Sequence, residues 1–148
     1  MHPFPFDLHT QGSHWFMCRN ALFGKSANSY LDDLESFYWV LCFIICVHGG
    51  PGPSRCELSP KMKLLFINNQ DAAANAKLDH FETSFKLPIS PYFGPPVAEL
   101  ARNLHSFFEN RITLGPAHDL KAVQLDYAEI VGYFASAIKR LSHNRDTR

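Results

Sequence analysis

A run of apolar residues between positions 30 and 48 constrains the fold of this chain more than any other stretch. Every position from Phe37 to Val47 is aliphatic, aromatic or cysteine. A helix with no polar face is either buried on all sides or lies in a membrane. The run is shorter than the ~20 residues that a bilayer crossing needs. We therefore predict an all-α domain built around a central hydrophobic helix, over about residues 31–48, that is buried on every side.

Polar side chains just before this run provide a helix start. Oxygens that can accept hydrogen bonds from the free N–H groups of a first turn stand at Asn28, Ser29, Asp32 and Asp33. The carboxylates of Asp32, Asp33 and Glu35 also suit the positive end of the helix dipole. We expect Asp33 to cap this helix.

The composition fits one globular domain. The chain has 148 residues and is 46% hydrophobic, which suffices for one sizeable core. It has 14 basic and 14 acidic residues and a formal net charge of zero. This balance gives no general attraction to nucleic acid or to an anionic membrane, so we expect neither as a partner.

The cysteines indicate an intracellular protein that is not secreted. Residues 1–6 lack the basic start and apolar run of a signal peptide, so Cys18 and Cys56 are expected to be reduced thiols in the cytoplasm or nucleus, as are Cys42 and Cys46. Cys42 and Cys46, with His48 close by, would be half of a metal site. No second pair with ligand spacing follows, so we expect core packing and no metal.

We expect five or six helices packed around the central one, and helical spacing indicates several of them. Residues 69–78 are rich in alanine, and apolar residues recur at helical spacing over 97–108, before the Gly115-Pro116 break. A final amphipathic helix is expected to begin at a cap formed by Asp119 or His118. Its predicted apolar face consists of Val123, Tyr127, Ile130, Val131, Phe134, Ile138 and Leu141. Lys61, Lys63 and Lys77 are interpreted as isolated surface lysines.

Three segments carry a resemblance to a known family. Residues 12–22 read Gly-Ser-His-Trp-Phe-Met-Cys-Arg-Asn-Ala-Leu, residues 32–39 read Asp-Asp-Leu-Glu-Ser-Phe-Tyr-Trp, and residues 66–77 contain Asp71-Ala72-Ala73 and Lys77. In this order they resemble the end of the activation segment, the start of the F-helix and an Ala-Ala-x-x-x-Lys neighbourhood of the fungal-type protein kinase family. The three matches cover about half of the chain.

The resemblance implies a truncated protein-kinase-like C-lobe of five or six helices. It implies a partial kinase domain at residues 12–142. Residues 1–11 are rich in Pro and His and show no periodicity, so we expect a disordered or extended lead-in there, and a frayed tail at 143–148. The resemblance places Gly12 and Ser13 at the border of the peptide-substrate groove, although a turn in which Ser13 satisfies local backbone explains them equally well. By the same resemblance Asp33 and Ser36 are the structural anchor that holds the catalytic loop in complete kinases.

Asn20 departs from the family pattern. The family usually has a Glu there, paired with a buried Arg near the end of the domain. An Asn supplies no charge, so Arg111, as a candidate partner, is expected to lack a carboxylate. Leaving a buried charge unpaired costs roughly 3–5 kcal/mol.

The resemblance implies a fragment of a Ser/Thr protein kinase domain that is inactive as this chain. The family phosphorylates protein with ATP and Mg²⁺, using a glycine-rich loop, a lysine, a catalytic Asp and a metal-binding Asp. None of these motifs is recognisable here, so we expect no catalytic, cofactor-binding or metal-binding residue in this chain. The alternative is a non-catalytic helical interaction module that binds a protein partner or the missing kinase half. A further possibility is that upstream coding sequence supplies the missing motifs.

Overall fold

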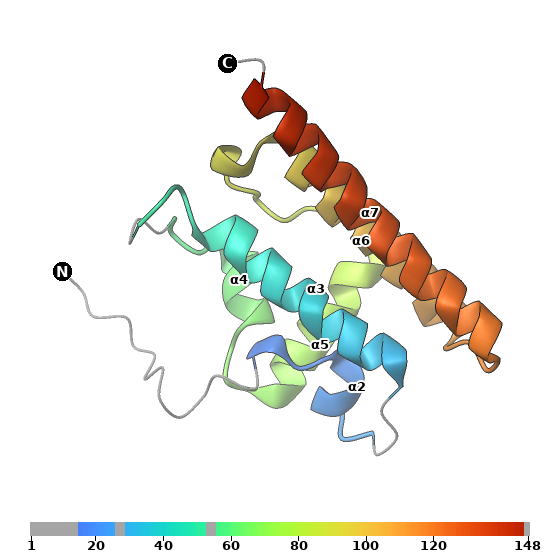
Figure 1. Cartoon of the computed structure of the whole chain (residues 1–148). Coiled ribbons are helices and arrows are strands. Elements are labelled where there is room, and N and C mark those ends of the chain that lie inside the picture. Colours follow the sequence, from blue (N-terminus) through green and yellow to red (C-terminus); the bar gives the residue numbers. More distant parts are fainter. Residues whose placement is uncertain (1–14, 26–28, 53–55, 147–148) are drawn as a thin grey trace.

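The fold is entirely helical over the part of the chain that the structure describes. The structure is a computed structural model that describes residues 15–25, 29–52 and 56–146. These residues contain no β-strand, and their regular elements are α2 (Arg19–Leu22), α3 (Tyr30–Val47), α4 (Pro60–Leu65), α5 (Gln70–Glu82), the 3-10 helix η1 (Pro91–Phe93), α6 (Gly94–Leu114) and α7 (Leu120–Asp146) (Figure 1). For these residues the prediction of an all-α fold with five or six α-helices is confirmed.

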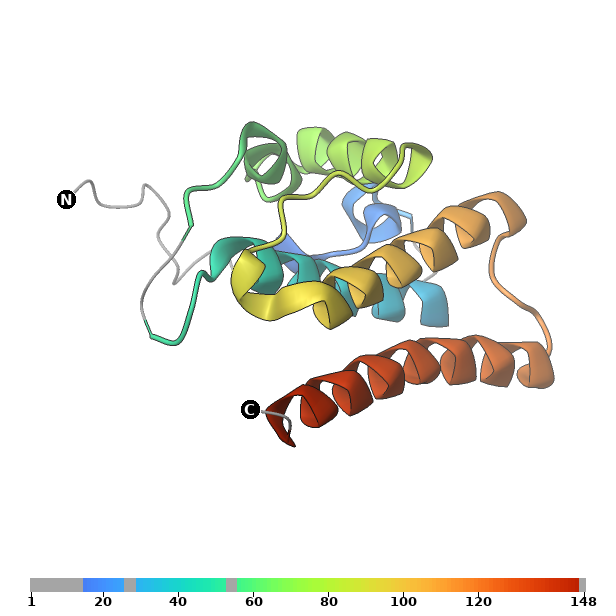
Figure 2. The same cartoon turned by 90° about the horizontal axis from the view of Figure 1, so that it is seen from above.

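The helices are arranged in layers. Figure 2 shows α4 and α5 on one side of the molecule, α3 and α6 through the middle, and α7 as an outer layer on the opposite side. The backbone of α7 approaches mainly that of α6, and the short helix α2 approaches mainly α5. The central place that the sequence assigned to residues 31–48 is therefore taken by α3.

Although α3 is central, it is not buried on every side. Its inner side contributes Tyr38 and Trp39, whose rings pack against Phe81 of α5. Its opposite side leaves Phe37 71% exposed, and Ile44 is exposed as well. The prediction of all-round burial is wrong, because α7 packs on α6 and leaves this side of α3 uncovered.

The apolar face of α7 also differs from the prediction. The helix buries Asp126, Ile130 and Ala137 against the rest of the molecule. Four of the seven side chains assigned to its packed face are exposed, namely Tyr127, Val131, Phe134 and Ile138. The buried face of α7 is therefore the one that contains Asp126, Ile130 and Ala137, and most of the predicted apolar face is turned away from the rest of the molecule.

Short polar side chains start several of these helices. Ser59 accepts a hydrogen bond from the N–H of Met62 at 3.3 Å, and Asn69 accepts one from Ala72 at 2.9 Å. Asp119 accepts one from the N–H of Ala122 at 2.9 Å, which confirms one of the two predicted caps of the last helix. That helix continues to Asp146, beyond the predicted end at residue 142.

Candidate functional site

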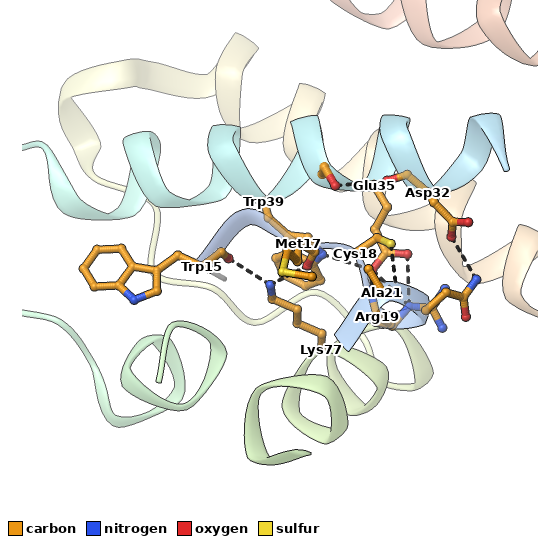
Figure 3. A network of polar contacts seen from close by, with 11 residues as sticks. Trp15, Met17, Cys18, Arg19, Ala21, Asp32, Glu35, Trp39 and Lys77 are labelled. Atoms are coloured by element: carbon orange, nitrogen blue, oxygen red, sulfur yellow. Dashed lines mark hydrogen bonds and ion pairs between the residues drawn. The ribbon is translucent and has the colours of Figure 1, made fainter. Parts of the chain in front are cut away.

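The most densely connected polar group lies where residues 15–22 rest on α3. The Glu35 carboxylate, which is 2% exposed, accepts a hydrogen bond from the backbone N–H of Arg19 at 2.8 Å. It also accepts two from Arg19 Nε, both at 3.2 Å, and one from Trp39 Nε1 at 3.1 Å (Figure 3). Glu35 thus has a charged partner and two further donors, as a buried carboxylate needs.

Lys77 of α5 holds the same segment from the other side. Its fully buried Nζ donates to the backbone carbonyls of Trp15 and Met17, both at 2.8 Å (Figure 3). The Nζ also lies 5.0 Å from the centroid of the Trp39 ring, within the range of a cation–π contact. Burial lowers the pKa of the Lys77 amine to about 8. The interpretation of Lys77 as a surface lysine is wrong.

These polar contacts hold residues 15–22 against α3 and α5. The thiol among them, that of Cys18, is not activated as a nucleophile. The Cys18 thiol accepts a hydrogen bond from the N–H of Ala21 at 3.4 Å, and burial raises its pKa to about 11. A thiol with a raised pKa is a poor nucleophile, because the thiolate is the reactive form. Beside it, the Asn20 amide donates to Asp32 at 2.8 Å. Glu35, Lys77 and Asn20 each connect residues 15–22 to α3 or α5.

The start of α3 is a capping box formed by Ser29, at the N-cap, and Asp32, at the third helical position, and Asp33 has no part in it. The Asp32 carboxylate accepts a hydrogen bond from the backbone N–H of Ser29 at 2.7 Å, while Asp33 is exposed. The prediction that Asp33 caps the helix is therefore wrong. Ser36 donates from its hydroxyl to the backbone carbonyl of Asp32 at 3.1 Å, within the same helix. Gly12 and Ser13 lie outside the described residues.

Arg111 does have a carboxylate partner, contrary to prediction. Its Nε donates to Asp126 Oδ2 at 3.0 Å, and its second contact to this carboxylate is from Nη2 to Oδ1. The Tyr30 hydroxyl donates to the same Asp126 at 2.6 Å and accepts from the N–H of Ala117 at 3.0 Å. The kinase resemblance indicated a partner at position 20, whereas the observed partner, Asp126, lies on the last helix.

The cysteines of α3 pack in the core. Cys42 and Cys46 are buried, and burial raises the pKa of both thiols, that of Cys46 to about 12. His48 is half-buried at the end of the helix. No group of three His, Cys, Asp or Glu side chains is placed to hold a metal ion in residues 15–25, 29–52 and 56–146. The interpretation of Cys42 and Cys46 as core residues is confirmed.

A buried histidine pair lies between α3, α5 and α6. His80 shares a hydrogen bond of 2.7 Å between its Nε2 and the Tyr38 hydroxyl, and His105 Nε2 lies 2.7 Å from the carbonyl oxygen of His80. His80 Nδ1 is buried without a hydrogen-bond partner in the described part of the chain. Burial lowers the pKa of His80 to about 3, so the ring is neutral at pH 7. Both rings are buried and His80 packs against the rings of Tyr38, Phe81 and Phe85, so we interpret the pair as a packing element.

One hollow in the surface is almost purely apolar. It lies between α3, α6 and α7 and has a volume of about 280 Å³. All of its lining side chains are aliphatic or aromatic: Leu34, Phe37, Tyr38, Leu104, Phe108, Ile130, Val131 and Phe134. We call it the α3–α7 hollow. A concave apolar surface with no polar group suits a hydrophobic side chain better than a reacting substrate.

Sequence reasoning missed the residues that organise these sites. Glu35 was given only a helix-dipole role, and Arg19 and His80 were given none. Lys77 had one signal, since the kinase resemblance singled it out. Nothing in the sequence indicated that Phe37 and Val131 are exposed. Periodicity shows which residues share a helix face, but it does not show which face a neighbouring helix covers.

In the residues that the structure describes, no helix combines the length and apolar character that a membrane crossing needs.

Comparisons with other proteins identify no family for this chain. Comparison of the chain with protein-family models, with curated proteins and with solved structures found no match.

Proposed function

We propose that this chain is the C-terminal part of a C-lobe similar to that of fungal-type protein kinases, and that alone it transfers no phosphate. The main observation that supports the proposal is that residues 15–22, which precede α3 in sequence, are held to α3 and α5 by buried polar contacts. Glu35 holds Arg19, and Lys77 holds the carbonyls of Trp15 and Met17. These contacts join all three segments on which the resemblance rests, which supports the kinase-like arrangement.

The same contacts explain why Lys77 is unsuited to nucleotide binding. Phosphoryl transfer needs a lysine on the phosphates, metal ions held by carboxylate and amide oxygens, and a base near the acceptor hydroxyl. The Lys77 Nζ is fully buried and donates to two carbonyls. A nucleotide would have to displace both carbonyls to reach it.

A thermal-shift titration with ATP and Mg²⁺ tests this proposal. A ligand that binds the folded state raises the melting temperature, by an amount set by RT ln(1 + [L]/Kd). We expect no rise up to millimolar ATP, while a complete protein kinase run in parallel gives one. A clear rise at submillimolar ATP would contradict the proposal. Finding an in-frame catalytic loop and metal-binding Asp upstream of Met1 in the transcript would make the chain part of an active enzyme.

The second candidate function is a non-catalytic helical interaction module. The α3–α7 hollow and the exposed Phe37 beside it favour this function. Contiguous apolar surface on a folded domain marks a site of protein contact or an aggregation liability. In the kinase-like arrangement the same surface would receive the missing half of the domain.

A further inference from the structure

Two rows of exposed apolar side chains border the α3–α7 hollow. The row on α3 contains Phe37 and Ile44, which are seven residues apart and so lie on one face of the helix. The row on α7 contains Tyr127, Val131, Phe134 and Ile138, at the spacing of one helix face. Phe37, Val131 and Phe134 themselves line the hollow. Each row therefore reaches the hollow through residues that line it, and we call the rows and the hollow together the α3–α7 surface.

This surface is large for a monomer. Phe37 is 71% exposed, Val131 63% and Ile138 61%. The exposed parts of the six side chains amount to roughly 600 Å², at the upper end for the largest apolar patch of a typical monomer and close to the ~800 Å² that each partner contributes to a standard interface. An area of this size can support a stable contact.

The surface carries few charged residues. On α3, Asp33 is exposed four residues before Phe37 and so lies on the same face of the helix. Between Lys121 and Lys139, Glu129 is the one exposed charged residue of α7, and its carboxylate accepts a hydrogen bond from the Tyr133 hydroxyl at 2.6 Å. The whole chain has a formal net charge of zero. Two copies of such a surface bring few like charges together, namely Asp33 and Glu129 of each copy, whereas a strongly charged partner would find little complementary charge on it.

The shape of the surface suits contact with an identical surface. A two-fold contact places the same patch of both copies face to face, so each protruding group must meet a recess in the same patch. Phe37 protrudes at the rim of the hollow, and the hollow of about 280 Å³ can take an aromatic side chain. A knob beside a recess on one face meets this requirement.

We infer that the α3–α7 surface is the contact between two copies of this chain, in which Phe37 of each copy enters the hollow of the other. The inference rests on the interaction-module function and does not depend on the kinase resemblance. Phe37 and Val131 are the anchors at its centre, where interface residues contribute most to affinity.

Light scattering after size exclusion, with sedimentation velocity, tests this inference on the full chain. We expect the mass to rise from one chain to two between about 1 µM and about 200 µM protein. Phe37→Glu and Val131→Glu should each raise the dissociation constant at least ~30-fold, because the carboxylate would be buried without a partner. Both sites are exposed in the single chain, so circular dichroism should show unchanged helix content.

Leu64→Glu is the matched control. Leu64 is an exposed residue of α4, on the side of the molecule away from α7 (Figure 2), so its change should leave the dimer intact. A wild-type chain that stays single at every concentration overturns the inference, as does a dimer that survives both Phe37→Glu and Val131→Glu. Equal loss of the dimer in Leu64→Glu would show non-specific association and would also overturn it.

Binding of a fluorescent apolar dye separates failure of this inference from failure of the interaction module. A single wild-type chain that binds the dye, and binds it less after Phe37→Glu, leaves the hollow open to a different partner and overturns the second-copy inference alone. A single chain that binds no dye rejects both.

Discussion

At the scale of residues, the molecule depends on a few buried polar groups whose partners come from distant parts of the sequence. The Glu35 carboxylate accepts hydrogen bonds from the backbone N–H of Arg19, from the Arg19 guanidinium and from the Trp39 indole. Lys77 reaches backbone carbonyls 60 and 62 residues away in sequence. Each group stabilises the fold only while all of its partners stay in place, because an unmatched buried donor or acceptor is costly.

The Glu35→Gln variant tests the first of these groups. The amide keeps the shape of the side chain but removes the charge opposite Arg19 and turns one acceptor into a donor. We expect the free energy of unfolding in urea to fall by about 2–4 kcal/mol. Glu109→Gln, at an exposed site on α6, should change it by less than about 0.5 kcal/mol. Equal stability of the two variants would contradict this account of Glu35.

His80 gives the fold a specific sensitivity to acid. Because burial lowers its pKa from 6.5 to about 3, the unfolded chain binds a proton at a pH where the folded chain does not. The stability is fully present above pH 6.5 and is lost as the pH falls toward 3. The slope that His80 contributes approaches about 1.4 kcal/mol per pH unit within this window.

Urea unfolding at several pH values between 6.5 and 4.5 measures this slope. Residues around His80 include Tyr38, Phe85 and His105, and Lys61 adds a positive charge that also opposes protonation. His80→Gln should have a shallower pH dependence than the wild type. The exposed His118→Gln should keep the wild-type slope. Parallel curves for His80→Gln and the wild type would exclude His80 as the source.

At the scale of elements, the sequence predicted the existence of the helices better than their packing. The apolar run of α3, the alanine-rich α5 and the Asp119 cap of α7 are local signals, and the structure contains all three features. Which face of α3 and α7 is covered depends on neighbours far along the chain. The unbroken apolar run assigned Phe37 to the core, and helical spacing assigned Val131 to a packed face. Both side chains are exposed in the structure.

The candidate site was predictable only in part, for the same reason. The resemblance to kinases drew attention to Lys77 and to the segment around Asp33, but the residues that cap α3 are Ser29, at the N-cap, and Asp32, at the third helical position. The Arg111–Asp126 pair joins two helices across 15 positions and involves Tyr30, which is 96 positions from Asp126. Spacing rules describe contacts within one helix, so they do not predict a contact between different helices.

Tyr30 connects α3 to α7, and its hydroxyl provides a test of that junction. Tyr30→Phe removes the donor to Asp126 and the acceptor of the Ala117 N–H while keeping the ring against Tyr127. We expect a loss of about 1–3 kcal/mol in the free energy of unfolding. Tyr92→Phe, at an exposed ring in η1, should lie within about 0.5 kcal/mol of the wild type. A neutral Tyr30→Phe would mean that Arg111 alone satisfies Asp126.

At the scale of the whole molecule, the nucleotide titration and the mass measurement address separate properties. A chain that does not bind ATP and forms a dimer through the α3–α7 surface would be a non-catalytic binding protein. A chain that does not bind ATP and stays monomeric, with a hollow that binds the dye, would leave that surface open to a different partner. Each experiment is informative by itself, because the outcome of one does not determine the outcome of the other.

The outer position of α7 affects how the molecule opens. This helix of 27 residues lies along α6 as an outer layer (Figure 2), and Tyr30 of α3 contacts its residues Asp126 and Tyr127. Segments with few covering neighbours detach at a lower free energy than the global transition. Its middle amides should therefore exchange with deuterium sooner than those of α3, and whatever covers the hollow would slow that exchange.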